Sequence, residues 1–399
     1  MSQAAELIAQ EARYGAHNYH PLDVVCTRGE GVHLTDVDGR RFMDFLSAYS
    51  AVNQGHNHPR IGAAMIAQIQ KLALTSRAFR NDQFPPLLEK LCRLTGFDQA
   101  LLMNSGAEAV ETALKAMRKW GYDQKGIAYG EAEIIVAEGN FHGRTTTIVG
   151  FSTDPDSTSR FGPFTPGFKI VPYGDLEAVR AAITPRTCAI FMEPVQGEAG
   201  VVIPPKGFLR GLREVADQAG ILLVLDEIQS GLGRTGKLFA FEHEGIRPDG
   251  VTIGKALSGG YYPVSAFLAS EAVMRVFTPG IHGSTYGGNP LACAVASAAL
   301  DVLVEERLVE HTAELAPHLE QRLRSLRTDK IAEVRCIGLW AGIQLKPEAG
   351  GARKYCLALK ERGMLCKDTH VDTMRLAPPL VITREQLDWA LDQLEAVLA

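Results

Sequence analysis

The sequence has little of what disulfide scaffolds, zinc domains and membrane proteins require. Its seven cysteines are scattered over 399 residues, form no C-x-x-C pair and are odd in number. A disulfide framework or a zinc site is therefore not expected, and the pattern suits a reducing cytosol. The longest nearly apolar run, residues 291–300, is about half of what a bilayer span needs. The chain also begins without a basic segment followed by an apolar core, so no signal peptide is expected.

An excess of charge of one sign is also lacking. Lysine and arginine total 41 and aspartate and glutamate 46, which gives a net charge of −5. This balance gives no reason to expect nucleic acid or an anionic membrane as a partner. The apolar fraction of 46% and the charged fraction of 22% are ordinary for a globular protein. We expect a soluble, cytoplasmic protein that is long enough for two or three domains.

Turn signals and hydrophobic periodicity divide the chain into three expected parts. Residues 1–50 form an N-terminal segment, in which GEG (29–31) and DVDGR (36–40) predict a β-hairpin. Residues 51–290 are expected to form a large domain, and residues 291–399 a smaller α+β domain.

In the expected large domain, apolar strands alternate with helical segments. This alternation predicts an α/β fold with a mostly parallel sheet that is covered by helices on both faces. The expected strands include 134–137, 188–192, 221–225 and 250–253, and the expected helices include 107–120 and 207–218. The last part is expected to contain a long helical stretch at 290–326, strand structure at 331–346, and helices at 354–363 and 384–399.

Two charged residues, Asp226 and Lys255, each follow an apolar strand. In open parallel sheets, ligands bind at the carboxyl ends of the strands. A buried carboxylate is costly unless it has a partner, so Asp226 alone would suggest a helix cap or a structural ion pair. Lys255 alone would suggest a solvated rim residue. Together they match one cofactor, because pyridoxal phosphate requires a lysine for its Schiff base and an acid against its pyridine nitrogen.

A site for the cofactor's phosphate is offered by NSGAEAVETALKAMRKW (104–120). Its apolar residues recur at i, i+3, i+4 and i+7, which predicts a helix that begins near Gly106. Backbone N–H groups at the start of a helix can bind a dianion. A helix that is simply capped at its N-terminus is the alternative, but Gly106 permits a close backbone approach and favours a ligand.

Six motifs occur in the order NSGAEA (104–109), NFHGR (140–144), EPVQGEAG (193–200), DEIQSG (226–231), GKALSGG (254–260) and GSTYGG (283–288). In this order and spacing they resemble the class III aminotransferases of fold type I. The resemblance covers essentially the whole chain. It implies a large domain with a mostly parallel sheet, a smaller C-terminal domain, and pyridoxal 5'-phosphate as the cofactor.

The resemblance also implies a role for each matching residue. Lys255 is expected to hold the cofactor and to move a proton between substrate and cofactor carbons, while Asp226 keeps the pyridine nitrogen protonated. The other expected cofactor-binding residues are Ser105, Gly106 and Ala107 at the phosphate, Phe141 and Ile228 on the two faces of the ring, Gln229 at its phenolic oxygen, and His142, Ser284 and Thr285. Thr285 is expected to come from a second subunit, which makes the active site a property of a homodimer.

Further stretches, among them HNYHP (17–21) and SAYSAVNQGH (47–56), resemble the ornithine aminotransferases within this class. That likeness implies transfer of the δ-amino group of L-ornithine to 2-oxoglutarate, with glutamate-5-semialdehyde and L-glutamate as products. Carboxylates of the substrates call for cations, and arginine grips a carboxylate with two hydrogen bonds. The expected substrate-binding residues are Arg144 for ornithine's α-carboxylate, Arg375 for glutamate's α-carboxylate, Glu198 as the partner that neutralises Arg375, and Tyr19 and Tyr49 beside the substrate.

Some features depart from this pattern. His142 and NSGAEA are closer to the acetylornithine aminotransferases, so an acetylornithine or 4-aminobutyrate aminotransferase is the alternative.

GLGRTG (231–236) matches a dinucleotide-binding pattern, but no helical periodicity follows it, and Leu238 stands where a phosphate-binding P-loop requires serine or threonine. We expect it to shape a loop near the active site. The histidines of GHNHP (55–59) are expected to lie in a structural turn, because no acid or cysteine cluster completes a metal site.

Overall fold

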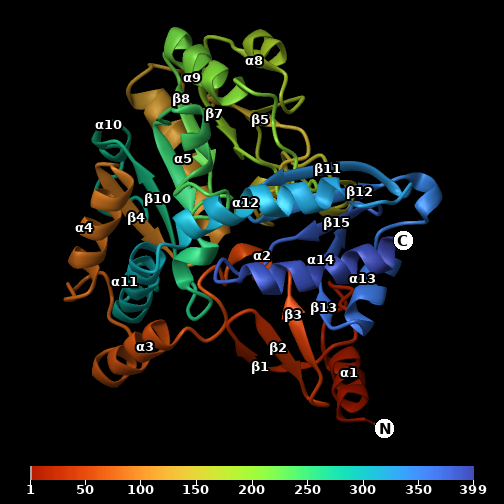
Figure 1. The fold of residues 1–399 in the computed structure, drawn as a ribbon. Helices are drawn as coiled ribbons and strands as arrows, with labels where there is room; N and C mark the ends of the chain where they lie inside the picture. The colour runs from red at the N-terminus through yellow and green to blue at the C-terminus, as the bar shows by residue number, and fades with distance from the viewer. Residues whose placement is uncertain (1) are drawn as a thin grey trace.

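The computed structural model describes residues 2–399 and is built around a seven-stranded sheet with the order β4-β10-β9-β8-β7-β5-β6 (Figure 1). These strands are β4 (Gln99–Met103), β5 (Glu133–Ala137), β6 (Phe168–Val171), β7 (Thr187–Met192), β8 (Leu222–Asp226), β9 (Gly250–Ile253) and β10 (Ser265–Ala269). Strands β9, β8, β7, β5 and β6 run parallel, and β10 is antiparallel to both of its neighbours. The predicted mostly parallel sheet and its four predicted strands are therefore confirmed.

Both faces of this sheet are covered by helices, because successive apolar residues point to opposite sides of a strand. In β5, Ile134 and Val136 belong to a core cluster on the side of α5 (Gly106–Asp123). Ile135 belongs to a second cluster together with residues of α9 (Phe208–Ala219). Residues that are buried on both faces explain why these strands are continuously apolar.

Two four-stranded sheets make up the remaining β-structure. The first has the order β1-β2-β3-β13, and its strands are β1 (Cys26–Glu30), β2 (His33–Asp36), β3 (Arg41–Asp44) and β13 (Met364–Leu365). The second, antiparallel throughout, has the order β11-β12-β15-β14, with β11 (Ile331–Ile337), β12 (Trp340–Leu345), β15 (Thr373–Leu376) and β14 (Lys367–Thr369). The parallel pairing of β13 with β3 joins the first and the last of the three predicted parts of the chain. Their boundaries at residues 50 and 290 stay a prediction.

The helical stretch expected at 290–326 is two helices, α11 (Pro290–Glu305) and α12 (Leu308–Arg324), which are separated at Arg307, a residue with a φ of +54°. The expected C-terminal helices are α13 (Arg353–Glu361) and α14 (Arg384–Leu398). The other helical segments are α1 (Gln3–Tyr14), α2 (Ser47–Ser50), α3 (Pro59–Lys71), α4 (Phe84–Thr95), α6 (Thr146–Val149), α7 (Pro155–Thr158), α8 (Leu176–Ala182), η1 (Ala240–Glu244), η2 (Lys255–Ser258), α10 (Glu271–Met274) and η3 (Pro347–Ala349). No helix within residues 2–399 is long and apolar enough to cross a membrane.

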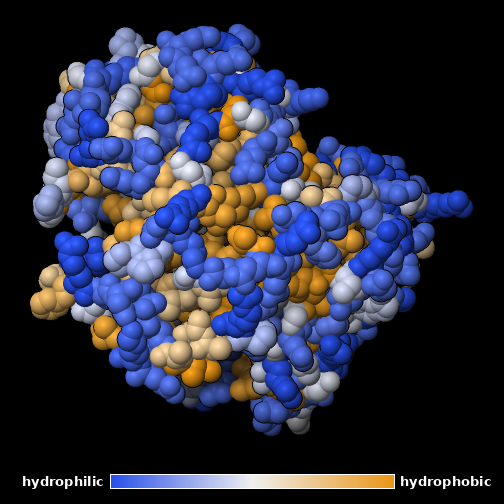
Figure 2. All heavy atoms as spheres, turned by 60° about the vertical axis from the view of Figure 1, so that its left-hand side comes forward, coloured by the Kyte–Doolittle hydropathy of each residue, from blue (hydrophilic) through white to orange (hydrophobic). Residues whose placement is uncertain are grey.

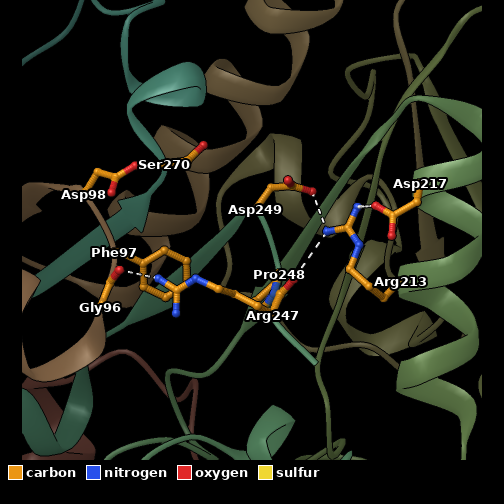
Figure 3. A pocket seen from close by; sticks show the side chains of 9 residues that line it. All are labelled: Gly96, Phe97, Asp98, Arg213, Asp217, Arg247, Pro248, Asp249 and Ser270. Carbon is orange, nitrogen blue, oxygen red and sulfur yellow. Dashed lines mark hydrogen bonds and ion pairs between the residues drawn. The ribbon is translucent and has the colours of Figure 1, made fainter. Parts of the chain in front are cut away.

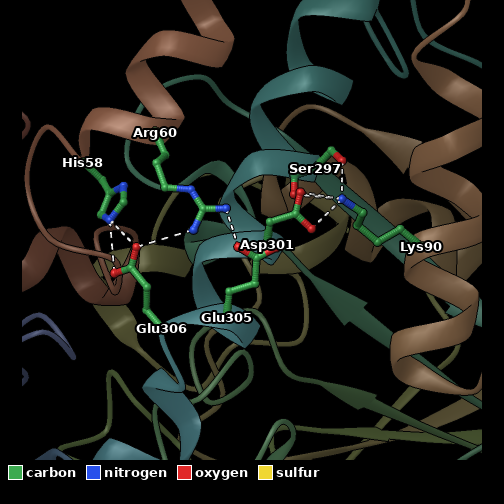
Figure 4. A network of polar contacts seen from close by, with 7 residues as sticks. All are labelled: His58, Arg60, Lys90, Ser297, Asp301, Glu305 and Glu306. Carbon is green, nitrogen blue, oxygen red and sulfur yellow. Dashed lines mark hydrogen bonds and ion pairs between the residues drawn. The ribbon is translucent and has the colours of Figure 1, made fainter.

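A network of charged side chains ties α3 and α4 to α11 (Figure 4). Arg60 of α3 reaches Glu305, with 2.5 Å between Nη2 and Oε2, and Lys90 of α4 reaches Asp301, with 2.7 Å between Nζ and Oδ1. His58 pairs with Glu306, 3.1 Å apart. The other histidine of the GHNHP turn, His56, lies 2.8 Å from Asp44 instead. The two histidines thus have different acidic partners, and each partner ties this turn to another element.

Candidate active site

The carboxyl ends of β8 and β9 open into a cavity of about 210 Å³ that is lined by both Asp226 and Lys255. Asp226 is the last residue of β8, and Lys255 follows the end of β9 by two residues. Adjacent parallel strands bring their carboxyl ends together at one edge of the sheet, and β8 and β9 are such neighbours. The complete lining is Gly106, Ala107, Phe141, His142, Gly143, Glu193, Val195, Asp226, Ile228, Gln229, Ser230 and Lys255.

Asp226 is buried and held by three groups. Its Oδ1 accepts hydrogen bonds from Thr252 Oγ1 and from the Ile228 backbone N–H, both at 3.0 Å. Its Oδ2 lies 2.7 Å from His142 Nδ1. The ring of His142 is itself fixed against Phe191, with 4.3 Å between the ring centroids. These contacts fix the position of the Asp226 carboxylate. A fixed position is what a carboxylate needs if it is to pair with one particular nitrogen of a ligand.

Lys255 is placed where its amine can act as a base. Burial lowers its pKa from the ordinary value, while the nearby carboxylates of Glu198, Asp226 and Glu193 oppose this shift. A lower pKa leaves more of the amine unprotonated near neutrality, which suits proton transfer. Lys255 also has a φ of +41°, a left-handed conformation that non-glycine residues rarely adopt and that is concentrated at functional sites.

The start of α5 forms one wall of the cavity. Ser105 caps this helix by accepting a hydrogen bond from the Glu108 N–H, and the Glu108 side chain returns to the Ser105 N–H. This leaves the N–H groups of Gly106 and Ala107, the first two of the helix, which have no carbonyl partner within it. A Cβ at Gly106 would lie 3.1 Å from Ile228 Cδ1, which is tighter than most real contacts. Ser284 lies nearby, since its Oγ accepts a hydrogen bond from Asn104 Nδ2 at 2.9 Å.

Beside the cavity, Arg375 of β15 is buried against Glu198. Arg375 Nη1 donates to Glu198 Oε1 at 2.6 Å, and Nε and Nη2 of the same arginine have no hydrogen-bond partner within the described residues. Burial disfavours the charge of Glu198, but the ion pair with Arg375, together with Lys255 and Gln229, lowers the pKa of this carboxyl. The Arg375 guanidinium lies 5.1 Å from the centre of the Tyr49 ring. Three of the predicted substrate-binding residues are therefore in one cluster.

Gln229 connects this cluster to the cavity by a close approach to Gly197. A Cβ at Gly197 would lie only 1.6 Å from Gln229 Oε1, so any side chain at position 197 would displace the glutamine. Gln229 Nε2 in turn reaches the Tyr49 carbonyl at 3.5 Å. The glycine that follows EPVQ is thus required by the glutamine of the DEIQ motif.

Three predicted site residues lie outside this enclosed arrangement. Arg144 is exposed, and its guanidinium lies 5.7 Å from the centre of the ring of Phe141, which lines the cavity. Tyr19 is 76% exposed and does not line the cavity. Thr285 is exposed and does not line the cavity of its own chain.

The structure adds residues that the sequence analysis did not single out. Glu193 lines the cavity and accepts hydrogen bonds from the Phe141 and Gly197 N–H groups, at 3.0 and 3.2 Å. Burial raises the pKa of Glu193 to about 7. Thr252 is the penultimate residue of β9 and bonds Asp226. Glu193 follows an apolar strand just as Asp226 does, and that placement is the signal that could have identified it.

The GLGRTG segment (231–236) is a run of buried turns and not the start of a helix. Its Arg234 is fully buried and bonds the carbonyls of Leu339 and Pro378 at 2.9 and 2.7 Å. The segment therefore connects the large sheet to the C-terminal part of the chain, close to Arg375.

A second hollow lies at the opposite end of the sheet, beside the amino end of β9 (Figure 3). Arg213 in this hollow pairs with both Asp217 and Asp249 at 2.7 Å. Figure 3 shows these three side chains pointing toward one another.

The main cavity fits pyridoxal phosphate on the chemistry of its donors. Two free N–H groups at the start of α5 suit a phosphate, Asp226 suits a protonated ring nitrogen, and Lys255 supplies the amine. Phe141 and Ile228 are apolar lining residues that could contact the two faces of a planar ring. His142 also lines the cavity and holds Asp226 through Nδ1, while its buried Nε2 has no hydrogen-bond partner among residues 2–399.

Comparison with known proteins agrees with this chemistry. Residues 14–398 match the family described as aminotransferase class-III. An ornithine aminotransferase of Bordetella pertussis is 61% identical over 389 residues, which cover 98% of this chain and 94% of that protein. The solved structure of the ornithine aminotransferase from Toxoplasma gondii is 41% identical, with a TM-score of 0.98 over 99% of this chain and 94% of that one. An acetylornithine aminotransferase from Elizabethkingia anophelis is 48% identical, with a TM-score of 0.91 over 100% and 99% of the two chains.

A family match over nearly the whole length, together with a cavity in which a lysine, an aspartate and a helix start converge, leads to one assignment. The chain belongs to the class-III aminotransferases, enzymes of fold type I that depend on pyridoxal phosphate.

Proposed function

We propose that this protein transfers the δ-amino group of L-ornithine to 2-oxoglutarate. The products are glutamate-5-semialdehyde, which cyclises to pyrroline-5-carboxylate, and L-glutamate. The proposal is supported by the likeness to ornithine aminotransferases over nearly the full chain. The observation that carries it is the ion pair of the buried Arg375 with the partly buried Glu198 beside the cavity, because the two substrates of this reaction place different groups there.

The two substrates must present different amines in one pocket. Glutamate reacts through its α-amine, so its α-carboxylate lies near the reacting carbon and needs Arg375. Ornithine reacts through its distal amine and has no carboxylate at that place, so an uncompensated Arg375 would be a buried charge without a partner. Glu198 would satisfy Arg375 during the ornithine half-reaction and release it during the other one. Arg144 would bind the far carboxylate in both cases.

When bound, pyridoxal phosphate supplies an electron-accepting ring that stabilises negative charge on the substrate carbon. We propose that Asp226 keeps the ring nitrogen protonated and that Lys255 holds the cofactor and moves the proton. The N–H groups of Gly106 and Ala107 would hold the phosphate, and Gln229 the phenolic oxygen. Burial raises the pKa of the Tyr49 hydroxyl, so this group stays protonated and narrows the pocket beside Arg375.

Single-turnover spectroscopy on the cofactor-loaded protein tests the substrate. L-Ornithine, N-acetylornithine and 4-aminobutyrate are added separately, the loss of the cofactor's absorption band is followed, and pyrroline-5-carboxylate is trapped. Fast loss with ornithine, together with trapped product, is the expected result. Faster loss with N-acetylornithine would contradict the proposal and favour the acetylornithine aminotransferases, to which His142 and NSGAEA are similar.

We also propose a homodimer in which Thr285 completes the partner's phosphate site. Exposed apolar side chains gather on α3 and the segment after it, namely Ile66, Ile69, Leu72, Leu74 and Phe79. Figure 2 shows apolar surface in the middle of a face that polar groups surround. The segment borders the start of α11, because the Leu291 N–H donates to the Ala73 carbonyl at 3.4 Å. Light scattering that gave the mass of a single chain would contradict this proposal.

The remaining proposals concern location and partners. The seven cysteines are all free thiols, which is consistent with a cytoplasmic location, and cell fractionation tests it. The net charge of −5 supports small molecules rather than nucleic acid or membrane as partners.

A further inference from the structure

The short segment α2 has a costly backbone conformation. Its four residues, Ser47, Ala48, Tyr49 and Ser50, all have positive φ angles between 45° and 71°. A left-handed conformation costs a non-glycine residue about 1–2 kcal/mol, and it persists only where surrounding contacts fix it. Tyr49 contacts Arg375, so the groups that hold this turn also determine where the Tyr49 ring lies.

One of these groups is Arg234 of the GLGRTG segment. Its Nη2 donates to Ser47 Oγ at 3.2 Å and to Asn53 Oδ1 at 2.5 Å. Its Nη1 donates to the carbonyls of Leu339 and Pro378. Burial lowers the pKa of Arg234 to about 9, so the side chain remains charged at neutral pH and keeps all of its donors.

Arg234 contacts both the segment that carries Tyr49 and the segment that carries Arg375. Ser47 comes two residues before Tyr49, and Pro378 comes three residues after Arg375. Ser47 Oγ also donates to the Ala377 carbonyl at 2.7 Å, which closes the connection between the left-handed turn and the segment after β15. A single guanidinium therefore sets the distance between the two backbones that carry Tyr49 and Arg375.

We propose that Arg234 is a positioning residue that fixes Tyr49 against Arg375 and thereby sets the selectivity of the pocket between its two substrates. This inference rests on the proposed function. It also gives the GLGRTG segment a purpose other than binding a nucleotide. When Arg234 or its link to Ser47 is weakened, the Tyr49 ring moves, and ornithine loses the surface that keeps it in the productive orientation.

Two variants test the inference from different directions. Arg234→Lys keeps the charge, but its single amine cannot reach all four acceptors. Ser47→Gly removes the hydroxyl, while glycine adopts a φ of 45° without strain, so the variant breaks the link to Arg234 without straining the turn itself. Arg213→Lys is the matched control, because Arg213 pairs with two carboxylates at the other end of the sheet (Figure 3). For each holoenzyme, the rate constants of the ornithine and glutamate half-reactions and the unfolding midpoint are measured.

The ratio of the ornithine to the glutamate rate constant is expected to fall about tenfold in both test variants, because a misplacement of about 1 Å costs up to about a hundredfold in rate. The double variant should fall no further, since both changes break one link. The control ratio should not change, even if its unfolding midpoint falls. An unchanged ratio in Ser47→Gly and in folded Arg234→Lys would overturn the inference.

Failure of the proposed function has a separate signature. If the unaltered holoenzyme does not react with ornithine, the substrate assignment is wrong. The ratio is then measured with the amine donor that does react, N-acetylornithine or 4-aminobutyrate, against glutamate. A change in that ratio still supports the positioning role, and its constancy still contradicts it.

Discussion

Glu198 occupies one of the three nitrogens of the Arg375 guanidinium and leaves the other two unused. The paired atoms are 2.6 Å apart, and the unused nitrogens are buried without a hydrogen-bond partner within residues 2–399. Buried donors without partners cost free energy, so these two nitrogens are available to a further acceptor such as a carboxylate. The ion pair is thus formed while two nitrogens of its arginine remain without a partner, as expected of a pair that opens reversibly when a substrate carboxylate binds.

Replacing Glu198 by alanine should favour glutamate. Arg375 would be permanently free for the α-carboxylate of glutamate, while ornithine would face an unpaired buried cation. We expect the ratio of the ornithine to the glutamate half-reaction rate to fall by about tenfold or more, because an unpaired buried charge costs several kcal/mol. Glu198→Gln, which keeps the size but not the charge, should behave similarly. Unchanged ratios in both variants would remove Glu198 from the gate.

Replacing Lys255 by alanine should abolish multiple turnover. Positioned proton transfer contributes about 10²–10⁴-fold in rate, and this variant also loses the amine that holds the cofactor. Lys125→Ala is a suitable control, since Lys125 is another partly buried lysine whose amine donates to the Thr187 and Ala219 carbonyls. Steady-state assays should show loss in the first variant only. Appreciable turnover by the Lys255 variant would overturn the assignment.

Glu227 predicts a pH dependence of stability. Burial raises the pKa of Glu227 from 4.5 to about 7, so between these values the folded protein holds a proton that the unfolded chain releases. The contribution of this bound proton to the free energy of unfolding is complete below pH 4.5, the pKa of Glu227 in the unfolded chain. It declines by about 1 kcal/mol per pH unit as the pH rises toward 7. Glu227→Gln should remove this decline because an amide does not ionise. The amide can still accept from the Phe241 N–H and donate to Ser230.

The measurement is the free energy of unfolding by denaturant at several pH values. The difference between Glu227→Gln and the unaltered protein should grow from pH 5 to about pH 7 and then stay constant. Glu310→Gln, on the exposed side of α12, should show no comparable trend. A difference that does not vary with pH would contradict the prediction.

Arg144→Gln should weaken the binding of both substrates. The exposed guanidinium beside Phe141 would bind a carboxylate in each half-reaction, so its loss should raise KM for ornithine and 2-oxoglutarate by about tenfold, with a smaller effect on kcat. Arg118→Gln is the control, because Arg118 also lies over a phenylalanine, Phe168, at 4.9 Å. If only kcat changed in the Arg144 variant, the binding role would be wrong.

The sequence predicted the central sheet well because its signals are local. Apolar strands with helices between them define β5, β7, β8 and β9, and the residues after two of those strands define the core of the site. The pairing of β13 with β3 joins residues more than 300 positions apart. A two-residue strand has no local sequence pattern from which this pairing could be predicted.

The left-handed turn could not be predicted either. SAYS contains no glycine or asparagine to indicate a positive φ, and the conformation depends on Arg234, nearly 190 residues away. For the same reason Arg234 looked like part of a glycine-rich loop. Its four acceptors come from three separate segments, and only the folded chain brings them together.

The contact between Gly197 and Gln229 has a consequence for attempts to redesign the substrate range. Because a Cβ at position 197 would overlap the glutamine amide, position 197 cannot take a side chain while Gln229 keeps its place. In a library that randomises the residues around Glu198 and keeps Gln229, every clone with a side chain at position 197 must displace this glutamine. Varying positions 197 and 229 together would instead open combinations that neither single search can reach.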